Sequence, residues 1–196
     1  MATWNGTAWD SVGNYPNSLV TDADVYNDTL YICGGFTKIG NMNTNYAAKF
    51  DGTNWYPMSF PFTTSGPIDK IRVFKNKVYA TGAWYANGFS LTAEFTQALG
   101  WKPSFGVQGD VTKGIFGLER IDSLLYFFGR FSHISTMNSP DIVGWSGTKL
   151  YGFGAGIDNT SDYSTIYNIE KIDGKIYAVG IFNNAGGMYL PEGTNR

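Results

Sequence analysis

The carboxylates are the side chains in this sequence whose number and spacing could support catalysis. Two acids on facing strands can hydrolyse a glycosidic bond, one as general acid and the other as nucleophile or base. Several acids recur at one position of an internal repeat described below, which favours a structural role, so we predict no catalytic residues. The acids considered are Asp22, Asp24, Asp69, Asp110, Glu119, Asp122, Asp141, Asp158, Asp162 and Glu170.

The single histidine and the single cysteine add little further chemistry. His133 would need partners to act as a metal ligand or a base, and the sequence has no Cys/His cluster. Cys33 lies in an apolar run, where a buried thiol behaves as a small hydrophobic side chain. Asp22 and Asp24 begin a polar run that lacks the glycine and the distant glutamate of a calcium loop. We therefore predict no metal and no cofactor.

Composition excludes two classes of partner. The chain of 196 residues has a formal charge of −2 and a pI near 5.3, so it offers no broad basic surface for nucleic acid. No segment approaches the roughly 20 apolar residues that span a bilayer, so we expect no membrane insertion. The first residues lack the basic segment and apolar core of a secretory signal, and we expect the protein to fold where it is made.

A seven-residue motif, here called the core motif, occurs four times. Each copy reads aliphatic, Tyr, two small or apolar residues, Gly, any residue and an aromatic. The tyrosines of successive copies are 48, 47 and 51 residues apart, and a period of this length indicates an array of similar units. The copies span 30–36, 78–84, 125–131 and 176–182.

A second motif, the turn motif, places an aromatic before a turn dipeptide and often a Trp after it. Asn-Gly and Asp-Gly predict tight type I′ hairpin turns. A polar turn also precedes every core motif, so we predict two hairpins, or four strands, in each unit. No segment keeps apolar residues at helical spacing without interruption, and no helix is predicted. The turn motif spans 4–9, 50–55 and 145–150, with a looser copy at 95–101.

These patterns predict an all-β fold, a small β-propeller of four blades with four antiparallel strands each, occupying residues 1–196 as a single domain. A linear β-solenoid is the competing arrangement, although its repeat is normally shorter. Residues 189–196 match the first half of a turn motif, and 7–12 supply the strand that would follow. We therefore expect the N- and C-terminal strands to pair and close the ring. Residues 2–4 and 188–190 both match the third strand of that last blade, and the sequence leaves both options open.

Polar segments follow each core motif and are expected to form surface loops. Aromatic side chains outside the two motifs either cap the core or provide a surface that contacts a sugar or a protein subunit. The polar segments are 37–45, 85–90, 132–140 and 183–187. The ligand-binding residues predicted in these rim loops are Tyr85, Asn87, His133 and Asn183.

The first repeat carries a family resemblance. Residues 30–37, which end in Gly-Gly-Phe-Thr, and residues 48–55, Ala-Lys-Phe-Asp-Gly-Thr-Asn-Trp, resemble the kelch-like propeller repeats of bacterial cell-surface proteins, fungal cortical polarity markers and some bacteriophage virion proteins. The resemblance covers nearly the whole chain, but Ala83 and Arg130 stand where the first repeat has Gly35. It implies a scaffold or recognition surface with no shared catalytic residues.

The resemblance and the missing export signal together favour a non-enzymatic structural or adhesion module, a bacteriophage virion component associated with the capsid or tail. The partners implied are other virion or surface proteins or a host-surface glycan, within an oligomeric assembly. Alternative locations are extracellular and cytoplasmic. The alternative functions are a carbohydrate-binding lectin or glycan-active enzyme with acids around the central channel, and an intracellular kelch-like adaptor.

Overall fold

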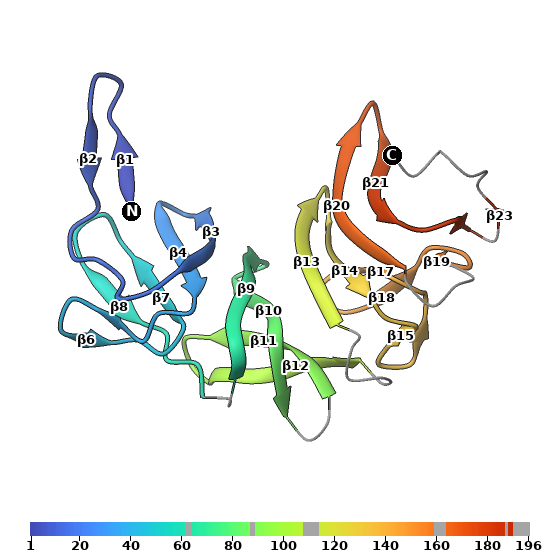
Figure 1. Ribbon diagram of the computed structural model, residues 1–196, viewed down its shortest axis with the longest axis horizontal. Helices are drawn as coiled ribbons and strands as arrows, with labels where there is room; N and C mark the ends of the chain where they lie inside the picture. The colour runs from blue at the N-terminus through green and yellow to red at the C-terminus, as the bar shows by residue number, and fades with distance from the viewer. Residues whose placement is uncertain (62–63, 87–88, 108–113, 159–163, 187, 190–196) are drawn as a thin grey trace.

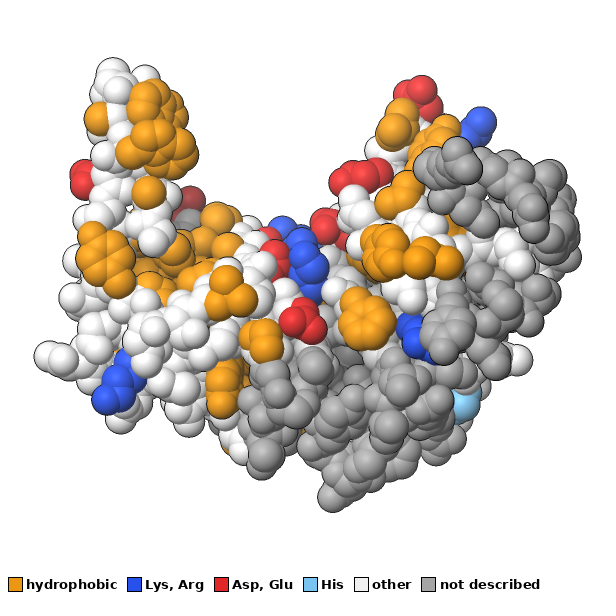
Figure 2. Space-filling view, viewed as in Figure 1, with side chains coloured by type: hydrophobic (Ala, Val, Ile, Leu, Met, Phe, Trp, Pro, Cys, Tyr) orange, Lys and Arg blue, Asp and Glu red, His pale blue; other side chains and the backbone are white. Residues whose placement is uncertain are grey.

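The computed structural model describes residues 1–61, 64–86, 89–107, 114–158, 164–186 and 188–189. The described part contains no helix and consists of strands in small antiparallel sheets, which confirms the predicted all-β class. The sheets follow one another along an open arc (Figure 1), and the space-filling view shows a notch between its two arms (Figure 2).

Each repeat of the sequence forms one unit of the arc. Units 1 to 3 each consist of an inner hairpin, whose second strand carries the core motif, and an outer hairpin built on the turn motif, whereas the described part of unit 4 has the inner hairpin alone. Unit 1 contains β3 (Val20–Tyr26), β4 (Thr29–Gly34), β7 (Ala47–Phe50) and β8 (Trp55–Pro57). Unit 2 contains β9 (Thr64–Phe74), β10 (Lys77–Ala86), β11 (Phe89–Thr96) and β12 (Gly100–Val107). Unit 3 contains β13 (Gly114–Ile121), β14 (Leu124–Arg130), β17 (Ile142–Trp145) and β18 (Leu150–Gly152). Unit 4 contains β20 (Thr165–Ile172) and β21 (Lys175–Ile181).

The inner hairpins turn tightly, as the polar residues before each core motif predicted. In unit 1 both central residues of the turn have positive φ, 47° at Asn27 and 56° at Asp28. In unit 4, Asp173 and Gly174 have φ of 49° and 76°. Positive φ at both central residues is type I′ geometry, whose twist matches that of the flanking strands.

The outer hairpins use a different turn from the type I′ turn predicted for them. Phe50 pairs with Trp55, so the loop contains four residues, and within it only Gly52 has positive φ. The Asp51 carboxylate accepts hydrogen bonds from Thr53 N at 2.8 Å and Asn54 N at 2.7 Å. These bonds lower the pKa of Asp51. The acid therefore replaces a backbone carbonyl in holding the turn, which the dipeptide alone did not indicate.

The glycine of the core motif is required because two backbones meet there. In units 1, 3 and 4 the strand facing this glycine has an irregular register, which brings a carbonyl oxygen against the glycine. A Cβ on Gly34 would lie 2.1 Å from Leu19 O, on Gly129 2.4 Å from Gly114 O, and on Gly180 2.0 Å from Thr165 O.

The segments after the core motif are more ordered than the surface loops predicted for them. In units 1 and 3 they contain short hairpins in which Ile39 pairs with Met42 and Ile134 pairs with Met137. Both isoleucines are buried, because the hairpin folds back over the core. These short strands are β5 (Lys38–Ile39), β6 (Met42–Asn43), β15 (His133–Ile134), β16 (Met137–Asn138), β22 (Asn184–Ala185) and β23 (Met188–Tyr189), and β22 also pairs with β19 (Ile157–Asp158).

The predicted closure of the ring within the chain is not formed among the described residues. The N-terminal hairpin consists of β1 (Ala2–Trp4) and β2 (Trp9–Ser11), which pair only with each other, while β21 pairs only with β20. The hairpin and unit 4 stand on opposite arms of the arc (Figure 1). The open question about the third strand is answered in part, because Met188 and Tyr189 form the short hairpin instead.

Candidate functional site

Asp22 and Asp24, two of the acids considered for catalysis, connect unit 1 to unit 2. Asp22 Oδ2 accepts hydrogen bonds from Ile71 N at 3.0 Å and from the Arg72 guanidinium at 2.5 Å. Asp24 Oδ2 accepts from Val73 N at 2.6 Å. Each bond joins a carboxylate on β3 to the first strand of the following unit. The acids therefore satisfy backbone donors at a junction, which explains their place in the repeat.

The same polar network continues into unit 3. Arg72 donates to Glu119 at 3.2 Å, and Arg120 donates to Asp24 at 2.8 Å and to Val73 O at 2.7 Å. The pKa of Arg72, which burial alone would lower, is raised by Asp22 and Glu119. Acidic and basic side chains gather at the floor of the notch (Figure 2). Two guanidinium groups thus tie three consecutive units together.

The other candidate acids that the structure describes lie in separate environments. Burial raises the pKa of Asp69. Asp141 is buried, and its Oδ1 accepts from Phe131 N at 2.7 Å. Asp122 accepts from Lys171 at 2.5 Å, again across a junction. Asp110, Asp162 and the side chain of Asp158 lie outside the described residues. No group of three or more His, Cys, Asp and Glu side chains in the described part is placed to hold a metal ion.

Of the four predicted rim residues, the structure describes the side chains of two, His133 and Asn183, and these follow the core motifs of different units. His133 begins β15, and its Nδ1 lies 3.0 Å from Ser132 Oγ. Asn183 lies between β21 and β22 and is partly buried. Tyr85 belongs to β10, but its side chain, like the whole of Asn87, lies outside the described residues.

The junctions between units are packed by apolar side chains from two facing sheets. We call the sheet face that looks toward the following unit the forward face, and the one that looks toward the preceding unit the rear face. At the first junction Cys33 and Phe60 of unit 1 pack with Ile71 and Trp101 of unit 2. Burial there raises the pKa of Cys33 to about 12. The same kind of cluster fills the next two junctions.

The forward face of unit 4 is exposed, unlike the forward faces of units 2 and 3. The core-motif tyrosine is 1% exposed at Tyr79 and 5% at Tyr126, but 49% at Tyr177. Two residues further on, Phe128 is 3% exposed, whereas Val179 is 58% exposed. Ile172, also on this face, is 57% exposed. A set of side chains that a following unit covers at three junctions is therefore left open at the end of the arc.

The rear face of unit 1 is the matching open surface at the other end. Val73 is 2% exposed in unit 2, whereas its equivalent Val25 is 62% exposed. Trp101 donates its indole N–H to Met58 O of the preceding unit, whereas the buried Nε1 of its equivalent, Trp55, has no partner among the described residues. Hydrophobic side chains lie on both arms beside the notch (Figure 2).

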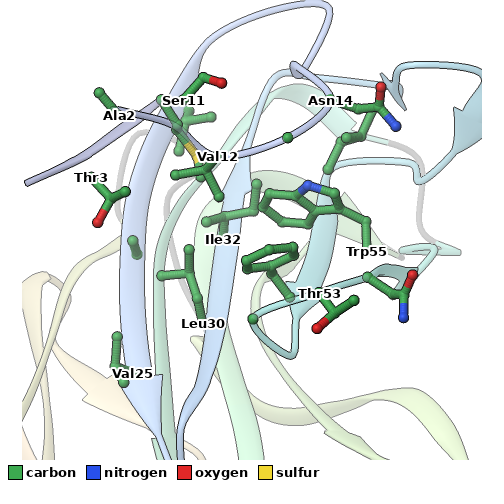
Figure 3. A pocket seen from close by; sticks show the side chains of 18 of the residues that line it. Ala2, Thr3, Ser11, Val12, Asn14, Val25, Leu30, Ile32, Thr53 and Trp55 are labelled. Carbon is green, nitrogen blue, oxygen red and sulfur yellow. The ribbon is translucent and has the colours of Figure 1, made fainter. Parts of the chain in front are cut away.

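A pocket of about 970 Å³ lies between this rear face and the N-terminal hairpin. Val12, Ile32 and the Trp55 ring meet around it, and Val25 and Leu30 line its lower part (Figure 3). Ala2 and Thr3 of β1 line its other wall. No motif predicted this pocket, although the turn motif at 4–9, which has no core motif before it in the sequence, was a signal that could have indicated it.

The arrangement offers apolar contact surfaces and, among the described strands, sheet edges without a neighbour, which are features of protein association. No helix in the described part is long and apolar enough to cross a membrane. No family model matches the chain and no curated protein matches it, so the resemblance to kelch-like repeats remains a prediction.

Proposed function

We propose that this protein is a non-enzymatic structural or adhesion module, a bacteriophage virion component that acts by contact with other virion or surface proteins. The observation that carries the proposal is the pair of exposed faces at the ends of the arc. The apolar side chains of these faces are equivalent to those buried at the three junctions. Exposed apolar surface of this extent on a folded protein is typical of an interaction site.

The proposed architecture is a β-propeller with four blades per chain, completed by pairing of the N-terminal hairpin with the C-terminal sheet. Two observations support it. Units 1 to 3 each hold an inner and an outer hairpin, whereas in the described part unit 4 has only the inner one and β1–β2 is an outer hairpin alone. The Trp4–Trp9 pair of β1–β2 also matches the Phe50–Trp55 pair of unit 1.

The proposed location in a virion rests on the resemblance of the repeats to kelch-like propeller repeats. Analysis of purified particles tests it. Mass spectrometry of purified phage particles from the strain that encodes this chain is expected to recover it at a constant ratio to the capsid protein. Its absence from purified particles would refute the location. The recombinant protein is also expected to release no sugar from host-surface polysaccharide, and measurable hydrolysis would refute the non-enzymatic role.

A host-surface glycan is the second candidate ligand, and one observation favours it. The rings of Trp4 and Trp9 lie 5.5 Å apart and are 52% and 71% exposed. Exposed indole rings offer flat apolar area on which a sugar can stack. Glycan-array binding that is lost in a Trp9→Ala variant would support this candidate.

A further inference from the structure

Among the described residues, β1–β2 stands without an inner hairpin and β20–β21 without an outer one, and these two hairpins are complementary in strand pairing. In units 1 and 3 the second strand of the inner hairpin pairs with the first strand of the outer hairpin, β4 with β7 and β14 with β17. Among the described residues β21 lacks such a partner, and so does β1 on its outer side. Each end therefore presents backbone donors and acceptors that the other end could satisfy.

The two ends are also complementary in packing. The pocket beside β1–β2 lies against the rear face of unit 1, where an inner hairpin of a preceding unit would stand. An inner hairpin with an exposed forward face is available in β20–β21. Insertion of that hairpin would cover Val25 and Leu30 on one side and Tyr177 and Val179 on the other. The contact would repeat the junction that this chain already forms three times.

We propose that the pocket of one copy receives β20–β21 of a second copy of this chain, and that two copies exchange these ends reciprocally. The inference rests on the proposed role in protein contact and names the partner. Within one chain, β20–β21 is anchored to unit 3 through the fully buried Ile166 and Ile169, on the arm opposite the pocket (Figure 1). Reciprocal exchange covers the pocket and the β20–β21 hairpin of both copies. A single contact would leave one pocket and one β20–β21 hairpin uncovered, so that further copies would add to the chain of contacts.

The repeat fixes the register of the new strand pair. Leu125 pairs with Trp145 and Phe127 pairs with Val143 in unit 3. The equivalent residues at the proposed contact are Ile176 with Trp4 and Ala178 with Ala2. Directly opposed residues of antiparallel strands have Cα atoms roughly 4.5–5.5 Å apart, a distance that a disulfide can bridge.

Cysteine cross-linking tests the contact and the identity of the partner. Ala2→Cys and Ala178→Cys are made as separate full-length variants, mixed and oxidised. We expect a disulfide-linked pair of chains in which mass spectrometry finds position 2 joined to position 178. Ala98→Cys, at an exposed turn between β11 and β12, replaces Ala2→Cys in the control mixture. Cross-linking no faster than in this control mixture overturns the proposal. So does a variant carrying both Ala2→Cys and Ala178→Cys that forms the disulfide only within its own chain.

A surface variant tests the same contact without cysteines. The wild-type chain is expected to sediment at twice its mass of 21.6 kDa. Val179→Asp places a charge on the exposed forward face and is expected to weaken self-association at least tenfold, while circular dichroism stays unchanged. Leu99→Asp, at a turn residue that is 72% exposed, is the matched control and should leave association intact. Equal effects of the two variants, or a monomeric wild-type chain, would overturn the inference.

The outcomes separate this inference from the proposed function. A chain that is found in virions but does not self-associate refutes the second-copy partner alone. A chain that forms the cross-linked pair but is absent from virions refutes the virion role and leaves the exchange of ends standing.

Discussion

Asp24 illustrates how a side chain that could serve catalysis serves a junction instead. Its two carboxylate oxygens accept separate bonds, from Val73 N and from Arg120. In the Asp24→Asn variant the side chain keeps one acceptor oxygen and gains an NH₂ group. One of the two donors, Val73 N or Arg120, would then face another donor and lose its hydrogen bond. We expect the free energy of unfolding to fall by about 1–3 kcal/mol, measured by urea denaturation. Asp28→Asn, in an exposed turn, is the control and should change it by less than about 0.5 kcal/mol. An equal loss in both variants would contradict a junction role.

Cys33 makes a prediction about reactivity. The thiol is fully buried, and burial raises its pKa to about 12 from an ordinary value of 9.0. At pH 8 it should react with a thiol reagent at least about a hundredfold more slowly than the unfolded chain does, because the thiolate is the reactive form. Because its folded pKa exceeds the unfolded one, its contribution to stability is complete below pH 9 and is lost as the pH rises toward about 12. Rapid labelling of the native protein would show that the first junction opens.

At the scale of the strands and turns, the core motif specifies a backbone contact through one glycine. A Cβ on Gly129 would lie 2.4 Å from Gly114 O, and both atoms belong to paired strands that have little freedom to separate. Gly129→Ala is therefore expected to destabilise the protein by about 1–3 kcal/mol, measured by thermal and urea unfolding.

Gly35→Ala is the matched control for this glycine. Its Cβ would lie 3.7 Å from Ser18 Oγ and 3.8 Å from Pro67 Cβ, which are ordinary contact distances, and the later repeats carry Ala83 and Arg130 at the equivalent position. We expect a change below about 0.5 kcal/mol. A strong effect at Gly35 together with none at Gly129 would contradict the bulge as the reason for the glycine.

The long strands of each repeat could be predicted from the sequence, whereas the two-residue strands could not. The two hairpins per unit follow from the motif spacing, because polar turn residues punctuate apolar strands. The short hairpins after the core motif were missed, although an isoleucine followed three residues later by a methionine occurs at Ile39 and Ile134. Two-residue strands have too few side chains to show an alternating pattern.

At the scale of the whole molecule, the sequence predicted units but not the shape that they form. The number of units in a ring depends on the angle between neighbours, which large and small residues at the junctions set together. Phe127 in unit 3 stands where unit 2 has Ala80 and unit 4 has Ala178, so the three junctions are not identical. A pattern of residue types does not carry such an angle, and the closed ring expected from the matching ends is replaced by an open arc.

The N-terminal hairpin gives the last prediction at this scale. Every residue of β1 and β2 is exposed, and the two strands pair only with each other among the described residues. Deletion of residues 1–11 should therefore lower the thermal midpoint of the monomer by less than about 3 °C. It should nevertheless abolish self-association, because it removes the strand that β21 of a second copy would join. Light scattering coupled to gel filtration measures the mass, and calorimetry in dilute solution measures the midpoint. A truncated chain that still doubles its mass would place the partner elsewhere on the arc, whereas a collapse in stability would show that the hairpin completes a sheet of its own chain.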